Sequence, residues 1–155
     1  MKKKLKWIFA ALAVAFVLLQ FTNPPRTNPP AVNDLMAASA PPPHVAAMLR
    51  AACYDCHSGE TRWPWYSRVA PMSWQIAKDV DDGRANLNLS DWPSENSKRA
   101  TKKLEDMSEQ IGYGEMPPKK YTLIHADARL TEGQRKELTD WLDGEAARLK
   151  ALSAR

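Results

Sequence analysis

The sequence predicts a small all-α domain that follows an apolar N-terminal segment and a proline-rich segment. Residues 5–21 are mostly apolar, and seven of the 12 prolines lie between Pro24 and Pro43. Residues 44–155 show apolar spacings of three and four, with little of the two-residue alternation of strands. A chain of 155 residues with 44% hydrophobic content suffices for one domain and excludes a multi-domain enzyme.

Residues 1–21 form a predicted membrane anchor. Four lysines stand within the first six residues, and residues 7–19 contain no charge. This length lies between a signal-peptide core and a full membrane span. The first Ala-x-Ala, at residues 38–40, lies far downstream and directly before Pro41, so an uncleaved anchor is favoured over a removed signal. The lysines are expected to stay in the cytoplasm, which places the rest of the chain on the periplasmic or extracytoplasmic side.

The net charge of +4 comes from this N-terminal segment. Without Lys2, Lys3, Lys4 and Lys6, the 22 basic residues become 18, equal to the 18 acidic ones. A neutral domain lacks the basic surface of a nucleic-acid-binding protein, so no nucleic-acid partner is expected.

Residues 22–43 are predicted to be a semi-rigid stalk. Paired and tripled prolines favour extended polyproline II, and this composition predicts that the segment buries no core residue. The alternative is a Pro-rich ligand for a recognition domain.

Residues 44–155 are predicted to contain four main helices. The first covers residues 45–52, and the second covers residues 73–80, beginning after Pro71 and ending near Gly83. The third follows Pro93 and ends at Gly112 or Gly114; its apolar stripe is Ala100, Leu104, Met107 and Ile111. The fourth begins with a capping box formed by Thr131 and Gln134. The residues along one side of this helix are Leu138, Trp141, Leu142, Glu145 and Leu149.

The only two cysteines stand in Cys53-Tyr54-Asp55-Cys56-His57. This is the C-x-x-C-H signature of covalent c-type haem attachment. Two thiols one helical turn apart can add to the two haem vinyl groups, and His57 then supplies an imidazole nitrogen to the iron. The sequence therefore predicts one haem c, held by Cys53 and Cys56.

Three other uses of these cysteines are disfavoured. A thioredoxin-like pair requires a βαβ setting, which the pattern lacks. Structural zinc requires four ligands, and only His44 and His125 remain as distant additions. A plain disulfide suits an extracytoplasmic domain but leaves His57 unexplained.

Met116 is the preferred candidate for the second axial ligand of the iron. It lies in Gly114-Glu115-Met116-Pro117-Pro118, where the prolines stiffen a non-helical loop. Met72 is the next candidate, His125 would give a bis-histidine site, and an open sixth position is the remaining alternative. Met48 and Met107 are expected in the core, and His44 and His125 in exposed loops.

Five tryptophans follow the anchor and are candidates for walls of a haem pocket or for an ordinary core: Trp63, Trp65, Trp74, Trp92 and Trp141. Arg62, Lys119 and Lys120 could pair with haem propionates, although a solvated charge is the default for each.

These motifs resemble the bacterial membrane-anchored haem-binding domain family, which is itself similar to mono-haem class I cytochromes c. The resemblance covers residues 41–141 and depends on the haem motif, Thr61-Arg62-Trp63-Pro64-Trp65-Tyr66, Ala70-Pro71-Met72-Ser73-Trp74, Gly114-Glu115-Met116-Pro117-Pro118 and Ala128-Arg129-Leu130-Thr131. It implies a helix leading into the haem motif, a Met ligand in a Met-Pro loop, and a C-terminal helix that crosses the first. The Trp-rich insert departs from the class I pattern.

We therefore expect an electron carrier with redox partner proteins, rather than an enzyme. His57 and Met116 would bind the iron, and two strong axial ligands would exclude substrate. The main alternative is a haem protein that binds a ligand, senses or reacts with peroxide at an open or weakly held sixth site. A non-redox, disulfide-closed recruitment module is the third possibility.

Overall fold

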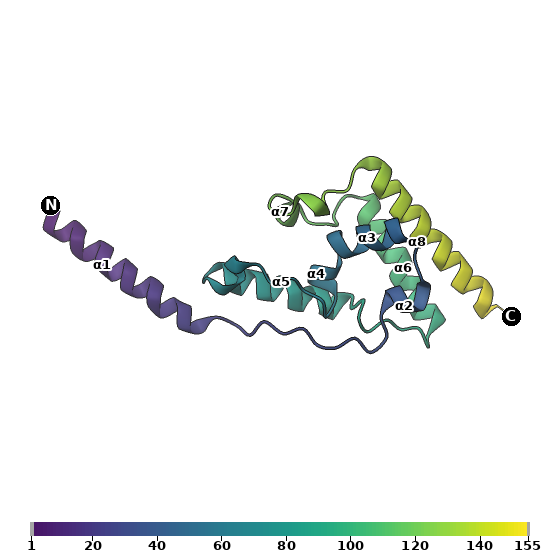
Figure 1. Cartoon of the computed structure of the whole chain (residues 1–155), viewed down its shortest axis with the longest axis horizontal. Helices are drawn as coiled ribbons and strands as arrows, with labels where there is room; N and C mark the ends of the chain where they lie inside the picture. Colours follow the sequence, from purple (N-terminus) through teal and green to yellow (C-terminus); the bar gives the residue numbers. More distant parts are fainter. Residues whose placement is uncertain (1, 155) are drawn as a thin grey trace.

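The computed structural model describes residues 2–154, which are mostly helical (Figure 1). No strand occurs among them; one isolated bridge joins Asn33 to Asp91. The α-helices in chain order are α1 (Lys2–Leu19), α2 (Leu35–Ser39), α3 (Pro43–Ala52), α4 (Tyr54–His57), α5 (Met72–Asn86), α6 (Ser97–Gly112), α7 (Lys119–Thr122) and α8 (Glu132–Ser153). Three 3-10 turns are η1 (Gln20–Thr22), η2 (Trp65–Arg68) and η3 (Ala126–Ala128). The all-α prediction is confirmed.

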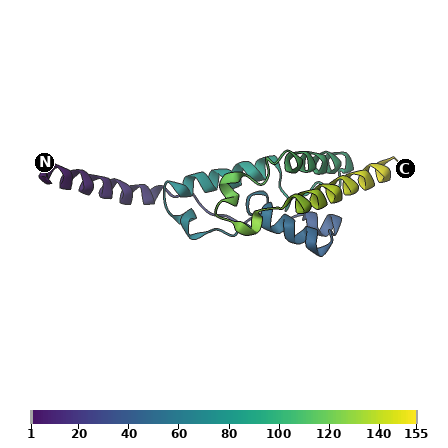
Figure 2. The same ribbon diagram turned by 90° about the horizontal axis from the view of Figure 1, so that it is seen from above.

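Helix α1 projects from the rest of the molecule (Figure 2) and none of its residues is buried. Together with η1 it forms a 21-residue helical stretch, Lys2–Thr22, that is long and apolar enough to cross a membrane. The expected apolar N-terminal helix is therefore present.

The core lies where α6 and α8 pack along each other, with α3 against α8. Leu104 of α6 and Leu138 and Leu142 of α8 are fully buried. Met48 and Met107 belong to the same core, as predicted. The capping box at Thr131 is present: its hydroxyl accepts from the Gln134 N–H, and the Gln134 side chain accepts from the Thr131 N–H. Helix spacing and caps thus account for this half of the domain.

The proline-rich segment differs from the expectation that it buries nothing. It runs along the domain, and Leu35 at the start of α2 is fully buried in the core. Asp34 caps α2 by accepting from the Met36 N–H, and the Leu35 N–H donates to the Leu89 carbonyl at 2.8 Å. The Trp92 N–H donates to the Asn33 carbonyl at 2.6 Å. The prolines fix an extended path, and the residues between them supply the contacts.

Helix α5 continues past Gly83 to Asn86, so the prediction that it ends near Gly83 is wrong. A Cβ at Gly83 would lie 2.5 Å from the Cys56 carbonyl oxygen. The absent side chain therefore serves the close approach of α5 to α4 and does not stop the helix.

The tryptophans divide between core and surface. Trp92 is buried, whereas Trp65 is 76% exposed and Trp74 is 39% exposed. Of the two roles expected for the five tryptophans, an ordinary core position is therefore wrong for these two, and Trp74 Nε1 donates to the Thr22 carbonyl just after the end of α1.

Candidate functional site

The haem motif forms a single helical turn between α3 and α5 (Figure 1). The Cys56 and His57 N–H groups both donate to the Cys53 carbonyl, at 3.2 and 2.9 Å. Tyr54 is buried in the core, and its hydroxyl donates to Asp34 Oδ1 at 2.9 Å. The core thus holds one side of the turn, and the two thiols and the imidazole are left half-buried.

His57 is oriented by the backbone of α5. Its Nδ1 lies 2.9 Å from the Gly83 carbonyl and 3.1 Å from the Leu87 carbonyl. A carbonyl can only accept, so Nδ1 carries the proton and Nε2 keeps its lone pair. Burial lowers the pKa of His57, which favours the neutral ring. Metal-binding histidines are held in this way, with the second ring nitrogen tied to a carbonyl or carboxylate.

The two thiols lie in an environment that favours uncharged sulfur. Both cysteines are free. Burial, and secondarily the neighbouring Cys56, raises the pKa of Cys53 to about 12; burial, and secondarily Asp55, raises the pKa of Cys56 to about 11. Reactive redox cysteines have a lowered pKa, so the raised pKa values of both thiols further disfavour a thioredoxin-like pair. Neutral thioether sulfurs suit the same surroundings.

Asp55, inside the motif, is bound on several sides. Arg62 donates to it from the backbone N–H at 2.9 Å, from Nε at 3.2 Å and from Nη2 at 3.0 Å. The Tyr121 hydroxyl donates to Oδ2 at 2.7 Å. Burial and this hydrogen bond raise the pKa of Tyr121, so the phenol stays protonated as a donor. The sequence motif gave no signal for Tyr121, which is 66 residues away.

Arg62 is therefore engaged by Asp55, and Lys120 pairs with Asp79 at 2.7 Å. Lys119 is exposed. These three residues therefore fit the prediction of ordinary surface charges, and Arg62 also stabilises the haem motif through its hydrogen bonds to Asp55.

The candidates for the second axial ligand occupy three different environments. Met116 is half-buried and packs against the core cluster that Cys53 also contacts. Its carbonyl accepts from Arg135 at 3.0 Å, and its N–H donates to the Gln110 carbonyl at 3.2 Å. Met72 is 48% exposed at the start of α5, whereas His57 bonds the opposite end of that helix.

His125 is half-buried instead of exposed, because its ring stacks on Tyr121 with centroids 4.0 Å apart. Its Nδ1 lies 3.0 Å from the Tyr121 carbonyl, and its Nε2 lies 3.1 Å from the Tyr66 hydroxyl. Both ring nitrogens are therefore engaged. His44 lies in α3 and not in a loop, but it is exposed as expected and pairs with Glu137.

The donor set fits a covalently held haem. Two neutral thiols stand one turn apart, and an adjacent imidazole presents a free Nε2. Among residues 2–154, no three His, Cys, Asp or Glu side chains are grouped as ligands for a metal ion. Sequence reasoning found the motif but missed the carbonyls of Gly83 and Leu87, which no pattern marks.

Comparison with known proteins identifies the family of the chain. The profile of the haem-binding domain family matches residues 14–144. No curated protein and no solved structure is significantly similar to the chain. The matched region includes the end of α1, the proline-rich segment, the haem motif, the Met116 loop and most of α8. The chain belongs to the haem-binding domain family.

Proposed function

We propose that the protein is a membrane-anchored, c-type mono-haem electron carrier. One haem is attached through Cys53 and Cys56, and His57 and Met116 bind its iron. The observation that supports this most directly is the pair of carbonyls on His57 Nδ1, which fixes the ring and leaves Nε2 for the metal.

When bound, the haem supplies an iron centre that exchanges one electron between Fe(II) and Fe(III). The chain's own residues attach and orient this group. The buried surroundings of Cys53 and Cys56 suit uncharged thioethers, and the α5 carbonyls hold the imidazole. The Gly83 contact keeps α4 and α5 close enough for that hydrogen bond.

Electron transfer is preferred over peroxide or ligand chemistry because the nearby acid–base groups are already committed. Asp55 accepts from both Arg62 and Tyr121, and both nitrogens of His125 are hydrogen-bonded. A general acid–base catalyst must be able to reach a bound substrate and exchange a proton with it.

Met116 is preferred over Met72 and His125 as the second ligand. Met72 is the first residue of α5, and Gly83 follows it in the same helix. At a rise of about 1.5 Å per residue, the two residues are about 16 Å apart along the helix axis. That places Met72 far from His57. Met116 is a soft thioether in a loop that backbone hydrogen bonds hold beside the core, and such a ligand stabilises Fe(II).

The membrane topology follows the charges of α1. The lysines at its start remain in the cytoplasm, and the haem domain lies on the periplasmic or extracytoplasmic side. The uncleaved anchor predicts that the intact mass of the purified protein includes residues 2–21.

The attachment is tested by replacing both cysteines. The Cys53→Ala/Cys56→Ala variant should lose all haem staining on denaturing gels, and each single variant should keep one thioether and a shifted pyridine haemochrome spectrum. Staining that persists in the double variant contradicts covalent attachment. A native protein without any haemochrome spectrum would instead support the recruitment module.

The sixth ligand is tested by Met116→Ala, with Met72→Ala as the matched control. Removing Met116 should abolish the weak far-red charge-transfer band of the ferric protein and lower the reduction potential, because sulfur favours Fe(II). Met72→Ala should leave both unchanged. If neither variant alters the spectrum and the native reduced protein binds carbon monoxide, the sixth site is open. If His125→Ala alone yields high-spin iron, the site is bis-histidine.

A further inference from the structure

The last turn of the anchor is fixed to the haem domain by side chains. Gln20 Oε1 accepts from the Ala70 N–H at 3.0 Å, and its Nε2 donates to the Ala70 carbonyl at 3.5 Å. Trp74 Nε1 donates to the Thr22 carbonyl at 3.2 Å. Asn23 Nδ2 donates to the Arg68 carbonyl at 3.2 Å. The domain therefore begins at the end of α1 without a free spacer.

Exposed apolar side chains gather at this end of the domain. Beyond α1, nine large hydrophobic side chains are exposed in the described part of the chain, and six of them belong to segments at this end: Phe21, Trp65, Met72, Trp74, Leu123 and Ile124. We call these six the apolar tip. His125, directly after Ile124, bonds Tyr66 of η2, which joins the two parts of the domain that contribute to it. Figures 1 and 2 show α7 and the start of α5 in the half of the domain nearest α1.

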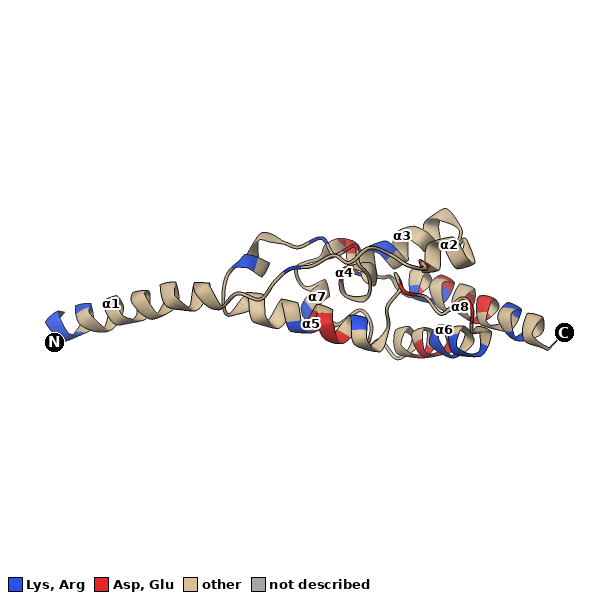
Figure 3. Cartoon of the chain, turned by 90° about the horizontal axis from the view of Figure 1, so that it is seen from below, with Lys and Arg blue, Asp and Glu red and all other residues tan. Residues whose placement is uncertain are grey.

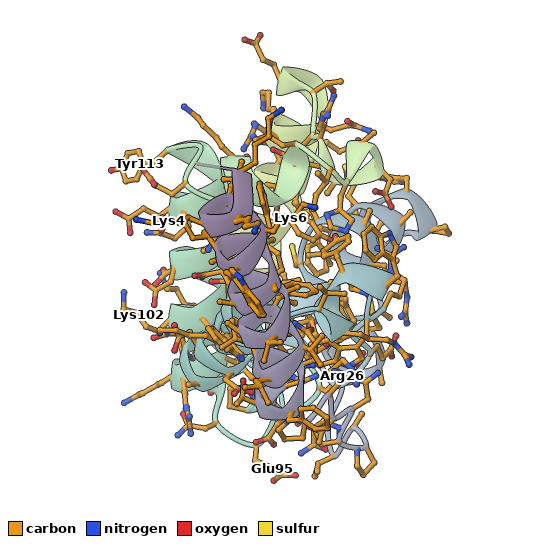
Figure 4. The ribbon with its side chains drawn as sticks, turned by 90° about the vertical axis from the view of Figure 1, so that its left-hand side faces the viewer. Lys4, Lys6, Arg26, Glu95, Lys102 and Tyr113 are labelled. Carbon is orange, nitrogen blue, oxygen red and sulfur yellow. The ribbon has the colours of Figure 1, made fainter. Side chains whose placement is uncertain are left out.

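The segments that supply the apolar tip carry only positive charges, although Lys120 pairs with Asp79 of α5 at 2.7 Å. The segments 19–33, 63–77 and 116–126 contain no acidic residue, and their charged residues are Arg26, Arg68, Lys119 and Lys120. Figure 3 shows acidic residues on α5, α6 and α8, near α4 and on the loops beside it, all farther from α1 than the start of α5. Figure 4, which views the molecule from the α1 side, labels Lys4 and Lys6 on that helix and Arg26 on the segment that leaves it. Aromatic and apolar side chains flanked by arginine and lysine are typical of segments in the headgroup region of a bilayer.

The length of α1 places this tip at the membrane surface. The helical stretch Lys2–Thr22 has 21 residues; without Lys2, Lys3 and Lys4, which stay in the cytoplasm, 18 residues remain and extend about 27 Å, close to the roughly 30 Å thickness of a hydrocarbon core. Gln20 to Thr22 then lie at the outer boundary, and the hydrogen bonds above hold residues 68–74 at the same level.

We infer that the haem domain is seated on the outer surface of the bilayer, with the apolar tip among the lipid headgroups. This rests on the proposed anchoring by α1. Because α5 runs from the tip to the His57 contacts, the haem motif would lie at most about 16 Å above the tip. The haem would then be held at a fixed short height, where its redox partners must reach it.

Hydroxyl-radical footprinting of the full-length holoprotein tests this in nanodiscs made of equal parts phosphatidylcholine and phosphatidylglycerol. Trp65 and Val32 are both 76% exposed in the structure, but only Trp65 belongs to the tip. After correction for intrinsic reactivity, the oxidation rate of Trp65 should be at least fivefold lower than that of Val32. Equal rates would overturn the inference.

A pair of variants adds a second readout. Trp65→Glu/Leu123→Glu places two charges in the tip and should raise the oxidation rate of Met72 at least threefold. The control, Val32→Glu/Leu152→Glu, places the same charges on exposed apolar positions elsewhere and should leave Met72 unchanged. An equal change in the Met72 oxidation rate in both variants would overturn the inference. If the tip variant does not fold, the comparison of Trp65 with Val32 in the native protein decides.

Failure of the anchor is distinguished by alkaline extraction of the membranes. A chain that stays in the membrane pellet while Trp65 and Val32 oxidise equally is anchored but not seated. A chain released by alkali contradicts the anchor, and with it the seating.

Discussion

Along α6 and α8, apolar side chains at helical spacing meet each other, whereas around α4 and the start of the domain, polar side chains bind backbone atoms. Leu104 and Leu142 are fully buried between the two long helices, and ion pairs such as Lys136 with Asp140 stay at the surface. Near the haem motif, Arg84 donates to the carbonyls of Ser58 and Thr27 at 2.8 and 3.0 Å.

This contrast reflects what each region must position. A helix pair needs only a continuous apolar seam, which any well-packed set of side chains provides. A haem motif needs two sulfurs and one nitrogen at defined points, and hydrogen bonds set such points because they are directional. Arg84 shows this, since its Nη2 also donates to the Thr61 hydroxyl at 2.9 Å and ties three segments together.

The largest effect is expected in the helix pair. Leu104→Ala should lower the free energy of unfolding by about 3 kcal/mol, because it removes a fully buried side chain and leaves a cavity. Urea denaturation of the solubilised holoprotein, followed by circular dichroism, measures this. Leu152→Ala on α8 is the control: its side chain is 53% exposed, and its loss should change the midpoint little. Equal losses would mean that the α6–α8 seam is not the main core.

The α6–α8 pair was predictable because the apolar residues that stabilise it recur at helical spacing along the chain. The stripe from Ala100 to Ile111 and the cap at Thr131 are visible from spacing alone; α6 ends at Gly112, as predicted, and α8 begins directly after Thr131. The haem motif was equally visible, since its five residues are contiguous.

The surroundings of the motif were not predictable, because their contacts join residues far apart in the sequence and do not repeat along the chain. Tyr121 and Asp55 meet across 66 residues, and the Gly83 and Leu87 groups that hold His57 are backbone carbonyls, which every residue has. The sequence predicts a helix end at Gly83 because glycine commonly has that role; only the packing of α5 on α4 shows that this glycine permits a close approach of the two helices. Leu35 was missed because the prolines around it dominate the local composition.

A pair of glycine variants sharpens the contrast. Gly144→Ala in α8 faces open space and should stabilise the protein by about 1 kcal/mol through helix propensity. Gly83→Ala should instead destabilise by about 2 kcal/mol, because its Cβ would lie 2.5 Å from the Cys56 carbonyl oxygen. Urea midpoints measure both.

Gly83→Ala should also act on the haem. The displaced helix would weaken the hydrogen bond from His57 to the Gly83 carbonyl, which makes the imidazole a poorer donor. Fe(III) would lose more stabilisation than Fe(II), so the reduction potential should rise. Stabilisation by Gly83→Ala with an unchanged potential would contradict the close approach of α4 and α5.

The smallest of the expected losses of stability tests whether polar contacts hold the motif. Tyr121→Phe keeps the ring that stacks on His125 but removes the hydroxyl that donates to Asp55, and it should cost about 1.5 kcal/mol because the acceptor is a carboxylate. Tyr113→Phe is the matched control, since that side chain is 74% exposed and its change should stay within about 0.5 kcal/mol. If the two variants have the same urea midpoint, Arg62 alone satisfies Asp55, and the link from the haem motif to α7 adds nothing to stability. If Tyr121→Phe is the weaker variant while its haem spectrum is unchanged, the hydrogen bond supports the fold of this region and not the iron.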